Sequence, residues 1–141
     1  MGRIITIFTD GGSRGNPGPA ASGVVIYEED KTVLARIGVK LGVTTNNVAE
    51  YTAILEGLLW VKDHRESLGE ISEINFFMDS LLARQQLTGN FKINKPHLIS
   101  IFRKIQELER ELEIKVSYTH VPREQNKEAD AMVNRALDNL L

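Results

Sequence analysis

The sequence contains no cysteine among its 141 residues. A disulfide framework, a zinc–thiolate site and a thiol nucleophile are therefore excluded. A signal peptide and an apolar run of membrane-spanning length are also missing, so we expect a cytoplasmic protein that has no membrane partner. Internal repeats and low-complexity segments are absent as well. The length suits one domain, residues 1–141, with a core large enough to need no covalent staple.

Excess positive charge is a further absence. The formal net charge is −2, from 17 lysines and arginines and 19 aspartates and glutamates. Proteins that bind nucleic acid irrespective of its sequence usually carry a basic patch and a basic balance. The overall charge thus counts against a nucleic-acid partner until individual charges are placed.

Apolar spacing predicts an alternating α/β chain. Runs rich in β-branched residues, or alternating between apolar and polar residues, predict strands at 4–10, 20–27, 32–41, 73–78 and 115–120. Helical spacing predicts helices at 48–65, 81–87, 97–112 and 125–140, with Ser80 as the N-cap of the second. The first three strands have short connections and predict an antiparallel meander. The whole order predicts a mixed sheet covered by helices.

Two acidic residues, Asp10 and Glu50, lie on strand and helix faces that are otherwise mainly apolar. Asp10 ends the first strand on the face of Thr6 and Phe8, although it also fits a polar strand end that enters a hairpin turn. Glu50 lies in the first turn of its helix, on the stripe that continues through Ile54. For Glu50 the alternative is a capping box, with Asn47 as the N-cap.

Two further acids begin helices. Asp79 follows the buried strand 73–78, at the carboxyl end where ligands bind in open α/β sheets. Asp130 lies in the first turn of the last helix, beside Ala129 and Val133. Both positions equally suit an acid that stabilises a helix N-terminus through the helix dipole.

Convergence of these acids would imply a metal centre. Four carboxylates in a partly dry site repel one another unless cations are bound. Oxygen ligands without cysteine or clustered histidine suit Mg²⁺ or Mn²⁺. Paired Mg²⁺ ions on shared carboxylates are typical of enzymes that hydrolyse phosphate esters. Spacing alone does not establish that the four side chains meet.

Four blocks in order resemble the signature motifs of ribonuclease H, type 1. The blocks are Thr9-Asp10-Gly11-Gly12, residues 45–51 (TNNVAEY), Asp79-Ser80, and residues 121–130 (VPREQNKEAD). The resemblance implies the ribonuclease H fold, with a five-stranded mixed sheet in the order 3-2-1-4-5 and helices on both faces. It also implies endonucleolytic cleavage of the RNA strand of an RNA–DNA hybrid, leaving 3′-hydroxyl and 5′-phosphate ends. Two Mg²⁺ ions, with Mn²⁺ as a possible substitute, would be held by Asp10, Glu50, Asp79 and Asp130.

The resemblance implies roles for other positions. A loop that approaches the RNA backbone and its 2′-hydroxyls would contain Gly11, Gly12, Ser13 and Asn16. Thr45 resembles the residue that holds a DNA-strand phosphate, and Asn46 and Asn47 resemble the pair that reaches the minor groove. Loop and capping chemistry is the alternative for all of these. Either His120 or Arg123 would assist catalysis or product release, although His120 stands at a strand end and also fits a packing role.

Some features depart from the better-known bacterial pattern. Leu81 cannot hydrogen-bond to a base edge, and the segment 89–97 lacks a basic handle, which resembles the compact archaeal and actinobacterial form. Arg84, Lys92 and Lys95 are the local candidates for phosphate contacts.

We expect a monomer that needs no protein partner. A non-catalytic hybrid-binding module, a DNA nuclease of the same fold and a small-molecule phosphatase remain as alternatives, each disfavoured by one of the motifs.

Overall fold

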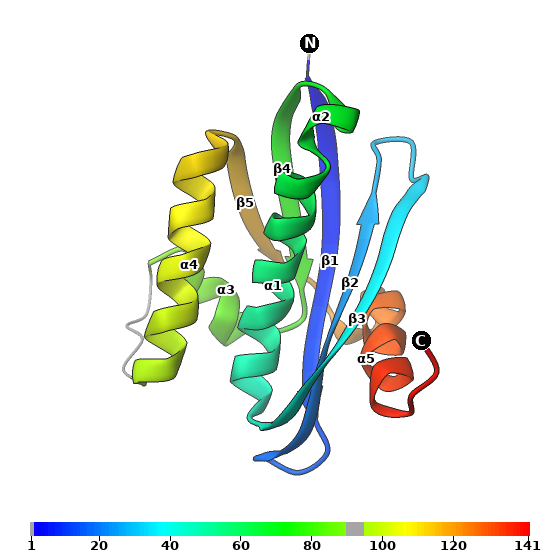
Figure 1. The fold of residues 1–141 in the computed structure, drawn as a ribbon, viewed down its shortest axis with the longest axis vertical. Helices are drawn as coiled ribbons and strands as arrows, with labels where there is room; N and C mark the ends of the chain where they lie inside the picture. Colours follow the sequence, from blue (N-terminus) through cyan, green and yellow to red (C-terminus); the bar gives the residue numbers. More distant parts are fainter. Residues whose placement is uncertain (1, 90–94) are drawn as a thin grey trace.

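The computed structural model describes residues 2–89 and 95–141. A five-stranded mixed sheet runs through it in the order β3-β2-β1-β4-β5, which confirms the order expected from the resemblance (Figure 1). β1 pairs antiparallel with β2, β2 antiparallel with β3, and the pairs β1–β4 and β4–β5 are parallel. The strands are β1 (Arg3–Ser13), β2 (Gly18–Tyr27), β3 (Val33–Thr44), β4 (Ile71–Met78) and β5 (Lys115–His120).

Helices cover both faces of this sheet. They are α1 (Asn46–Asp63), α2 (Arg65–Leu68), α3 (Leu81–Leu87), α4 (Pro96–Leu112) and α5 (Lys127–Leu137), with a 3₁₀ turn at Arg123–Gln125. α1 lies along β1 and β2 and carries α4 beside it, whereas α5 packs on β1, β2 and β3 (Figure 1). Neighbouring glycines of β1 show that these are opposite faces, because a Cβ on Gly11 would meet α1 and a Cβ on Gly12 would meet α5.

The α1 face holds the main hydrophobic core. Ile5 and Ile7 of β1 are fully buried there, together with Ile54 and Leu58 of α1 and Phe76 of β4. Alternate residues of a strand point to one face, which is why Thr6 and Phe8 lie on the other side. Burial of each large apolar side chain contributes about 1.5–3 kcal/mol. Most of the folding free energy therefore comes from this side of the sheet.

The α5 face is packed through glycine. Asp10 pairs with Gly23, and Gly23 pairs with Gly38, so the three residues form a row across β1, β2 and β3. A Cβ on Gly23 would lie 2.2 Å from the carbonyl oxygen of Ala129 in α5. Only glycine allows this close approach of helix backbone to sheet. The row thereby brings the first turns of α5 close to Asp10.

Several predicted boundaries are corrected. β1 continues to Ser13 and β3 to Thr44, so the expected loops at 11–18 and 42–47 are shorter. The antiparallel ladder extends them, since Ser13 pairs with Ala20 and Gly18 with Thr44. The short helix α2 was not predicted, and α5 ends at Leu137. The predicted bounds of β5 and α3 are confirmed. Most of the predicted loop at 89–96 lies outside the described residues.

Candidate active site

One hollow collects the four carboxylates. Asp10 of β1, Glu50 of α1, Asp79 after β4 and Asp130 of α5 all line a cavity of about 260 Å³. The pairing of β1 explains the opening, because β4 accompanies β1 only as far as Thr9, where it pairs with Met78. Beyond Thr9, β1 keeps β2 on one side only, and side chains from both faces of the sheet meet on the other side.

Asp10 is in the middle of β1, not at its end as the sequence suggested. Its position on the face of Thr6 and Phe8 follows the predicted alternation, but that face is half-buried beside α5 and does not hold the main core. The pKa of Asp10 is raised to about 8. Burial is the main cause, and the nearby Asp79 charge and a hydrogen bond with Asp130 act in the same direction. Asp10 thus resists ionisation when no cation is present.

Glu50 is not part of a capping box. Thr45 is the N-cap of α1, and its hydroxyl accepts a hydrogen bond from the backbone N–H of Val48 at 3.3 Å. Glu50 consequently lies in the second turn, beyond the reach of the cap. Burial raises the pKa of Glu50 to about 7, and the Asp79 charge adds to this, while a hydrogen bond from Ser80 and the charge of Arg123 act in the opposite direction.

The two helix-starting acids differ in their surroundings. Asp79 immediately precedes Ser80, whose hydroxyl accepts a hydrogen bond from the N–H of Ala83 at 3.1 Å and so caps α3 as predicted. With Ser80 as the cap, α3 does not depend on Asp79 for capping. Asp130 lies in the first turn of α5, as predicted, and its carboxylate accepts a long hydrogen bond from Asn134 at 3.5 Å.

The donor set fits a divalent cation that a substrate helps to hold. Burial, together with the charge of Asp79, raises the pKa values of Asp10 and Glu50, so a bound cation would favour the ionised cluster. Within residues 2–89 and 95–141, no three carboxylate or imidazole side chains are arranged to hold one metal ion by themselves. Mg²⁺ often binds through one or two carboxylates together with water and substrate phosphates. The open hollow suits that mode better than a closed protein cage.

Arg123 and His120 occupy different surroundings. Arg123 lies in the 3₁₀ turn, lines the hollow, and its charge lowers the pKa of Glu50. His120 ends β5 beside Met78 and is exposed, and among the described residues it is not part of the lining of the hollow. The packing role considered for His120 is therefore wrong, because an exposed side chain buries little surface.

The residues expected to contact substrate form one connected rim. The amide of Ser13 and its hydroxyl donate to Oδ1 of Asn46 at 2.8 and 3.0 Å, and the amide of Asn46 donates to Oδ1 of Asn16 at 3.1 Å. Together with the Thr45 cap, these bonds supply the loop and capping chemistry that the sequence left open. They also fix the start of α1 to the end of β1 beside the carboxylates.

The glycines of this region are in β1 and not in a loop. A Cβ on Gly11 would lie 2.2 Å from the carbonyl carbon of Ala49, so packing of α1 against β1 requires glycine at this position. Gly11, Gly12 and Ser13 all line the hollow. Asn47 lies in the first turn of α1, next to this rim.

Sequence reasoning missed Asn126, which links two of the acids. Asn126 is 1% exposed, and its Nδ2 donates to the carbonyl oxygen of Thr9 at 2.9 Å. The backbone carbonyl oxygen of Asn126 accepts from the backbone N–H of Asp130 at 3.1 Å. It therefore joins the neighbour of Asp10 to the start of α5. Its place four residues before Asp130, directly ahead of a helix, was the available signal.

Arg14 is a second residue that the sequence did not single out. It lines the hollow beside Ser13 and forms an ion pair with Asp138, with 2.7 Å between Nη1 and Oδ1. An arginine between serine and glycine after a strand is a weak signal. Both side chains are about half exposed, so the pair contributes little to stability.

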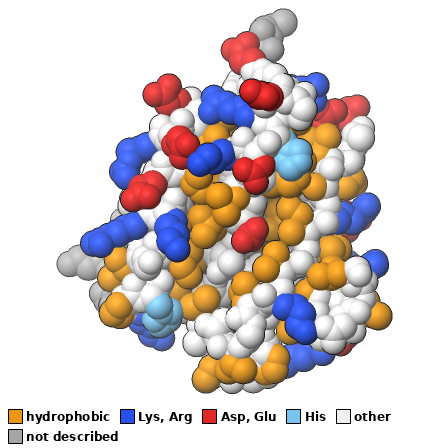
Figure 2. Space-filling model, viewed as in Figure 1, with side chains coloured by type: hydrophobic (Ala, Val, Ile, Leu, Met, Phe, Trp, Pro, Cys, Tyr) orange, Lys and Arg blue, Asp and Glu red, His pale blue; other side chains and the backbone are white. Residues whose placement is uncertain are grey.

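The three basic residues predicted to contact phosphate, Arg84, Lys92 and Lys95, differ in their surroundings. Nε of Arg84 donates to the carbonyl oxygen of Tyr118 at 3.3 Å, which ties α3 to β5. Lys95 is exposed at the N-cap of α4. Lys92 lies outside the described residues. Figure 2 shows acidic and basic side chains interspersed over the face that carries α1 and α4, so charge of neither sign dominates that face.

Comparison with known proteins places the chain in a family. The model of the family described as "Reverse transcriptase-like" matches residues 8–136. LC11-RNase H1, isolated from compost by a metagenomic approach, is a solved structure with a TM-score of 0.90 and 40% identity, covering 96% of each chain. The same protein has been solved in complex with an RNA/DNA hybrid, with a TM-score of 0.89.

Two curated relatives are longer than this chain. Ribonuclease HI of Halobacterium salinarum is 41% identical over 141 residues, which are 98% of this chain and 66% of that protein. A bifunctional protein of Mycobacterium tuberculosis is 40% identical over 135 residues, 95% of this chain and 35% of that protein. The chain thus spans between a third and two thirds of these relatives. No helix in the described part of the chain is both long and apolar enough to cross a membrane. The matches over residues 8–136 and to LC11-RNase H1 show that the chain belongs to this reverse transcriptase-like family and, within it, to the type 1 ribonucleases H.

Proposed function

We propose that this protein is an endoribonuclease that hydrolyses the RNA strand of RNA–DNA hybrids and leaves 3′-hydroxyl and 5′-phosphate ends. The observation that carries the proposal is the shared lining of one open hollow by carboxylates from four separate segments. The similarity to LC11-RNase H1, which has been solved with an RNA/DNA hybrid, supports the choice of substrate. An open hollow also suits a polymer better than a small molecule, which usually occupies a more enclosed pocket.

Asp10, Glu50, Asp79 and Asp130 would hold two Mg²⁺ ions together with the substrate, and Mn²⁺ would substitute. When bound, such ions neutralise charge on the attacking and leaving oxygens and lower the pKa of a nucleophilic water. The protein's part is to supply the negative charge that holds them. Asp10 and Glu50, with pKa values of about 8 and about 7, would release their protons as the cations bind.

The rim would position the hybrid. Gly11, Gly12, Ser13 and Asn16 would approach the RNA strand and its 2′-hydroxyls, which distinguish RNA from DNA. Thr45 would hold a phosphate of the DNA strand, and Asn46 and Asn47 would reach the minor groove. The hydrogen bonds that already join Ser13, Asn16 and Asn46 support this role, because a rim held in place loses little freedom on binding.

Arg123 would assist release of the product or orient the attacking water. The new 5′-phosphate carries additional negative charge, and an arginine stays protonated at any working pH. Its position in the lining of the hollow favours it over the exposed His120. We take the catalytic unit to be a monomer, since one chain supplies all four carboxylates, and we expect it to act in the cytoplasm.

A substrate panel tests the proposal. The protein is incubated with end-labelled RNA–DNA hybrid, duplex RNA, duplex DNA and single-stranded RNA, each with Mg²⁺, with Mn²⁺ or with chelator. We expect internal cuts in the RNA strand of the hybrid alone, with either metal, and no cuts with chelator. Cleavage of duplex DNA at a comparable rate, or hydrolysis that persists in chelator, would contradict the proposal.

A further inference from the structure

A second hollow lies on the α5 face of the sheet, beyond the N-terminus of α5. Its volume is about 620 Å³, and it shares no lining residue with the hollow of the carboxylates. Thr6 and Phe8 of β1 and Phe77 of β4 form its floor. Its walls come from the end of β2, the β2–β3 turn and the first turn of α5, through Tyr27, Glu28, Glu29, Lys31, Val33 and Glu128. We name this hollow the aromatic groove.

The floor of the aromatic groove is a set of half-buried rings. Phe8 and Phe77 are stacked, with ring centroids 5.1 Å apart, and Tyr27 meets Phe8 edge-on at 5.7 Å. In the described part of the chain, α5 is the helix that packs on this face of the sheet, and it leaves these rings partly open to solvent. Aromatic faces carry partial negative charge and favour apolar groups and cations alike.

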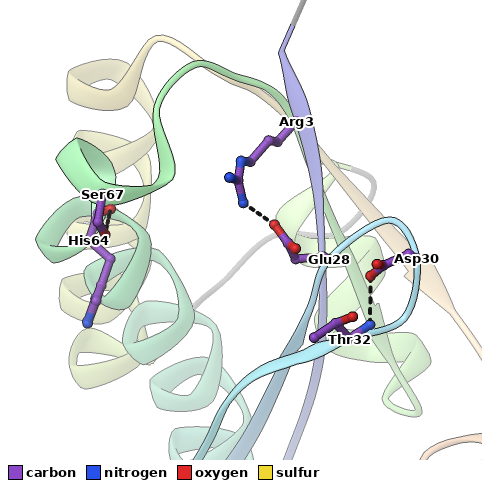
Figure 3. A network of polar contacts seen from close by, with 6 residues as sticks. All are labelled: Arg3, Glu28, Asp30, Thr32, His64 and Ser67. Carbon is purple, nitrogen blue, oxygen red and sulfur yellow. Dashed lines mark hydrogen bonds and ion pairs between the residues drawn. The ribbon is translucent and has the colours of Figure 1, made fainter.

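The walls are acidic and are already held in place. Glu28 forms an ion pair with Arg3, as Figure 3 shows, and Glu128 accepts a hydrogen bond from the hydroxyl of Tyr27. In the β2–β3 turn, which begins at Glu28, the amide of Thr32 donates to Oδ1 of Asp30 at 3.0 Å (Figure 3). An ordered turn means that a ligand meets walls whose shape does not have to form on binding.

The charges of the lining are unequal. Three acids, Glu28, Glu29 and Glu128, line the groove with one lysine, Lys31. Outside the lining, Arg3 pairs with Glu28, and the charge of Arg36 opposes the rise that burial causes in the pKa of the Tyr27 hydroxyl. Glu29 is exposed and makes no hydrogen bond or ion pair with any residue that the structure describes. The lining itself therefore carries more negative than positive charge, which favours a positively charged occupant over the phosphate backbone of a nucleic acid.

We propose that the aromatic groove is a docking site for a basic segment of another protein, one in which lysine or arginine flanks an aromatic residue. The aromatic side chain would lie on the rings of Phe8 and Phe77, and the flanking cations would face Glu29 and Glu128. This site is separate from the carboxylate hollow, so the proposal does not depend on the reaction catalysed there. Such a contact would tether the nuclease to a partner while its catalytic hollow stays open.

The first test uses a defined peptide. A short capped peptide with tryptophan between two arginines is titrated into isotopically labelled protein, and amide shifts are followed by NMR. We expect saturable shifts at Thr6, Phe8, Tyr27, Val33 and Phe77, and none with a matched peptide in which glutamate replaces arginine. Replacing tryptophan by serine should weaken binding. Absence of saturable shifts up to a peptide concentration on the order of 1 mM would overturn the proposal.

Charge variants of the β2–β3 turn provide the second test. Glu29→Lys should weaken peptide binding about fivefold, the effect of losing one exposed attraction and gaining one repulsion. Lys31→Glu, two residues away, should tighten it by a similar factor. Glu107→Lys, on the exposed side of α4, is the matched control and should leave affinity unchanged. Hydrolysis of hybrid should be the same in all three variants. Equal affinities for Glu29→Lys and Lys31→Glu would contradict the proposal.

Discussion

The two faces of the sheet differ in how much apolar side chain they bury. On the α1 face, Ile5, Ile7 and Phe76 are fully buried in one continuous core. On the α5 face, the buried cluster is small, made of Ala21, Val133 and Ala136, and beside it lie close-packed glycines, the Asp10 carboxylate and the aromatic groove. One strand, β1, serves both, because alternate residues point to opposite sides. The carboxylate hollow lies where the two faces meet, with Glu50 from α1 and Asp130 from α5, so the main core can be altered without changing the carboxylates.

The largest expected effect is the loss of activity in Asp79→Asn. This change keeps the shape of the side chain but removes a charge that raises the pKa of both Asp10 and Glu50. Hydrolysis of hybrid should fall by roughly 10³-fold or more, the scale of a lost metal ligand. In chelator the variant should be more stable than the parent, because like charges are less crowded.

The control for Asp79→Asn is Asp63→Asn at the exposed end of α1, which should change neither property. Steady-state hydrolysis and urea unfolding measure the two quantities. Turnover of Asp79→Asn close to that of the parent in saturating Mg²⁺ would contradict its assignment as a ligand.

Phe76 and Phe77 are adjacent in β4 and point to opposite faces of the sheet, so replacing each one compares the stability of the two faces. Phe76→Ala opens a cavity in the core of the α1 face and should cost about 3–5 kcal/mol of unfolding free energy. Phe77→Ala, on the half-buried opposite face, should cost about 1–2 kcal/mol. Urea unfolding at fixed pH measures both. Equal losses for the two variants would show that the α5 face carries as much stability as the α1 face.

The carboxylate hollow should make stability depend on pH when metal is absent. Asp10 and Glu50 have raised pKa values, so the folded state binds more protons than the unfolded state between about pH 4 and about pH 8. The contribution of these two groups to the unfolding free energy should be highest below that window. It should fall as pH rises through the window, by up to about 1.4 kcal/mol per pH unit for each extra proton held.

Other carboxyls require a control for this pH dependence. Burial also raises the pKa of Glu56 and Glu109, which lie away from the hollow and contribute in the same direction. Asp79→Asn leaves those groups unchanged and should reduce the dependence in chelator only in part, because burial remains the main cause of the raised pKa values of Asp10 and Glu50. An unchanged slope in this variant would show that the Asp79 charge does not contribute to the dependence.

The smallest expected effect separates Arg123 from His120. Arg123→Ala should lower kcat by about tenfold, the scale of one charge-assisted contact, with little change in KM. His120→Ala should change kcat little, and its exposure predicts a stability change within about 0.5 kcal/mol. Single-turnover and steady-state rates distinguish chemistry from product release. A large loss of kcat in His120→Ala with a mild one in Arg123→Ala would give the role to the histidine.

Local signals in the sequence were sufficient for some elements. The alternation of residues 115–120 predicted β5 with its observed bounds, and Ser80 was predicted as the cap of α3. The start of α1 was harder, because Thr45, Asn46 and Asn47 are all good caps. Long-range hydrogen bonds from Asn46 to Ser13 and Asn16 accompany the choice of Thr45, and spacing does not contain them.

The site was only partly predictable for a similar reason. Gly11 and Gly12 read as a turn, since glycine disfavours strands, yet pairing with β2 and the approach of α1 extend β1 through them. The meeting of the four acids depends on where β4 stops beside Thr9, which is a property of the sheet. Motif resemblance pointed to the acids, but not to Asn126, whose role rests on one buried contact.

The central claim is that the four carboxylates act together as a cation site. Its most direct test is the unfolding temperature at about pH 8, in chelator and across a Mg²⁺ titration, for the parent protein and Asp10→Asn. Binding of Mg²⁺ to the folded state alone should raise the unfolding temperature of the parent in proportion to ln(1 + [Mg²⁺]/Kd). The variant should start higher in chelator and gain much less from Mg²⁺. An unfolding temperature that Mg²⁺ leaves unchanged in the parent, or raises equally in both proteins, would contradict the claim.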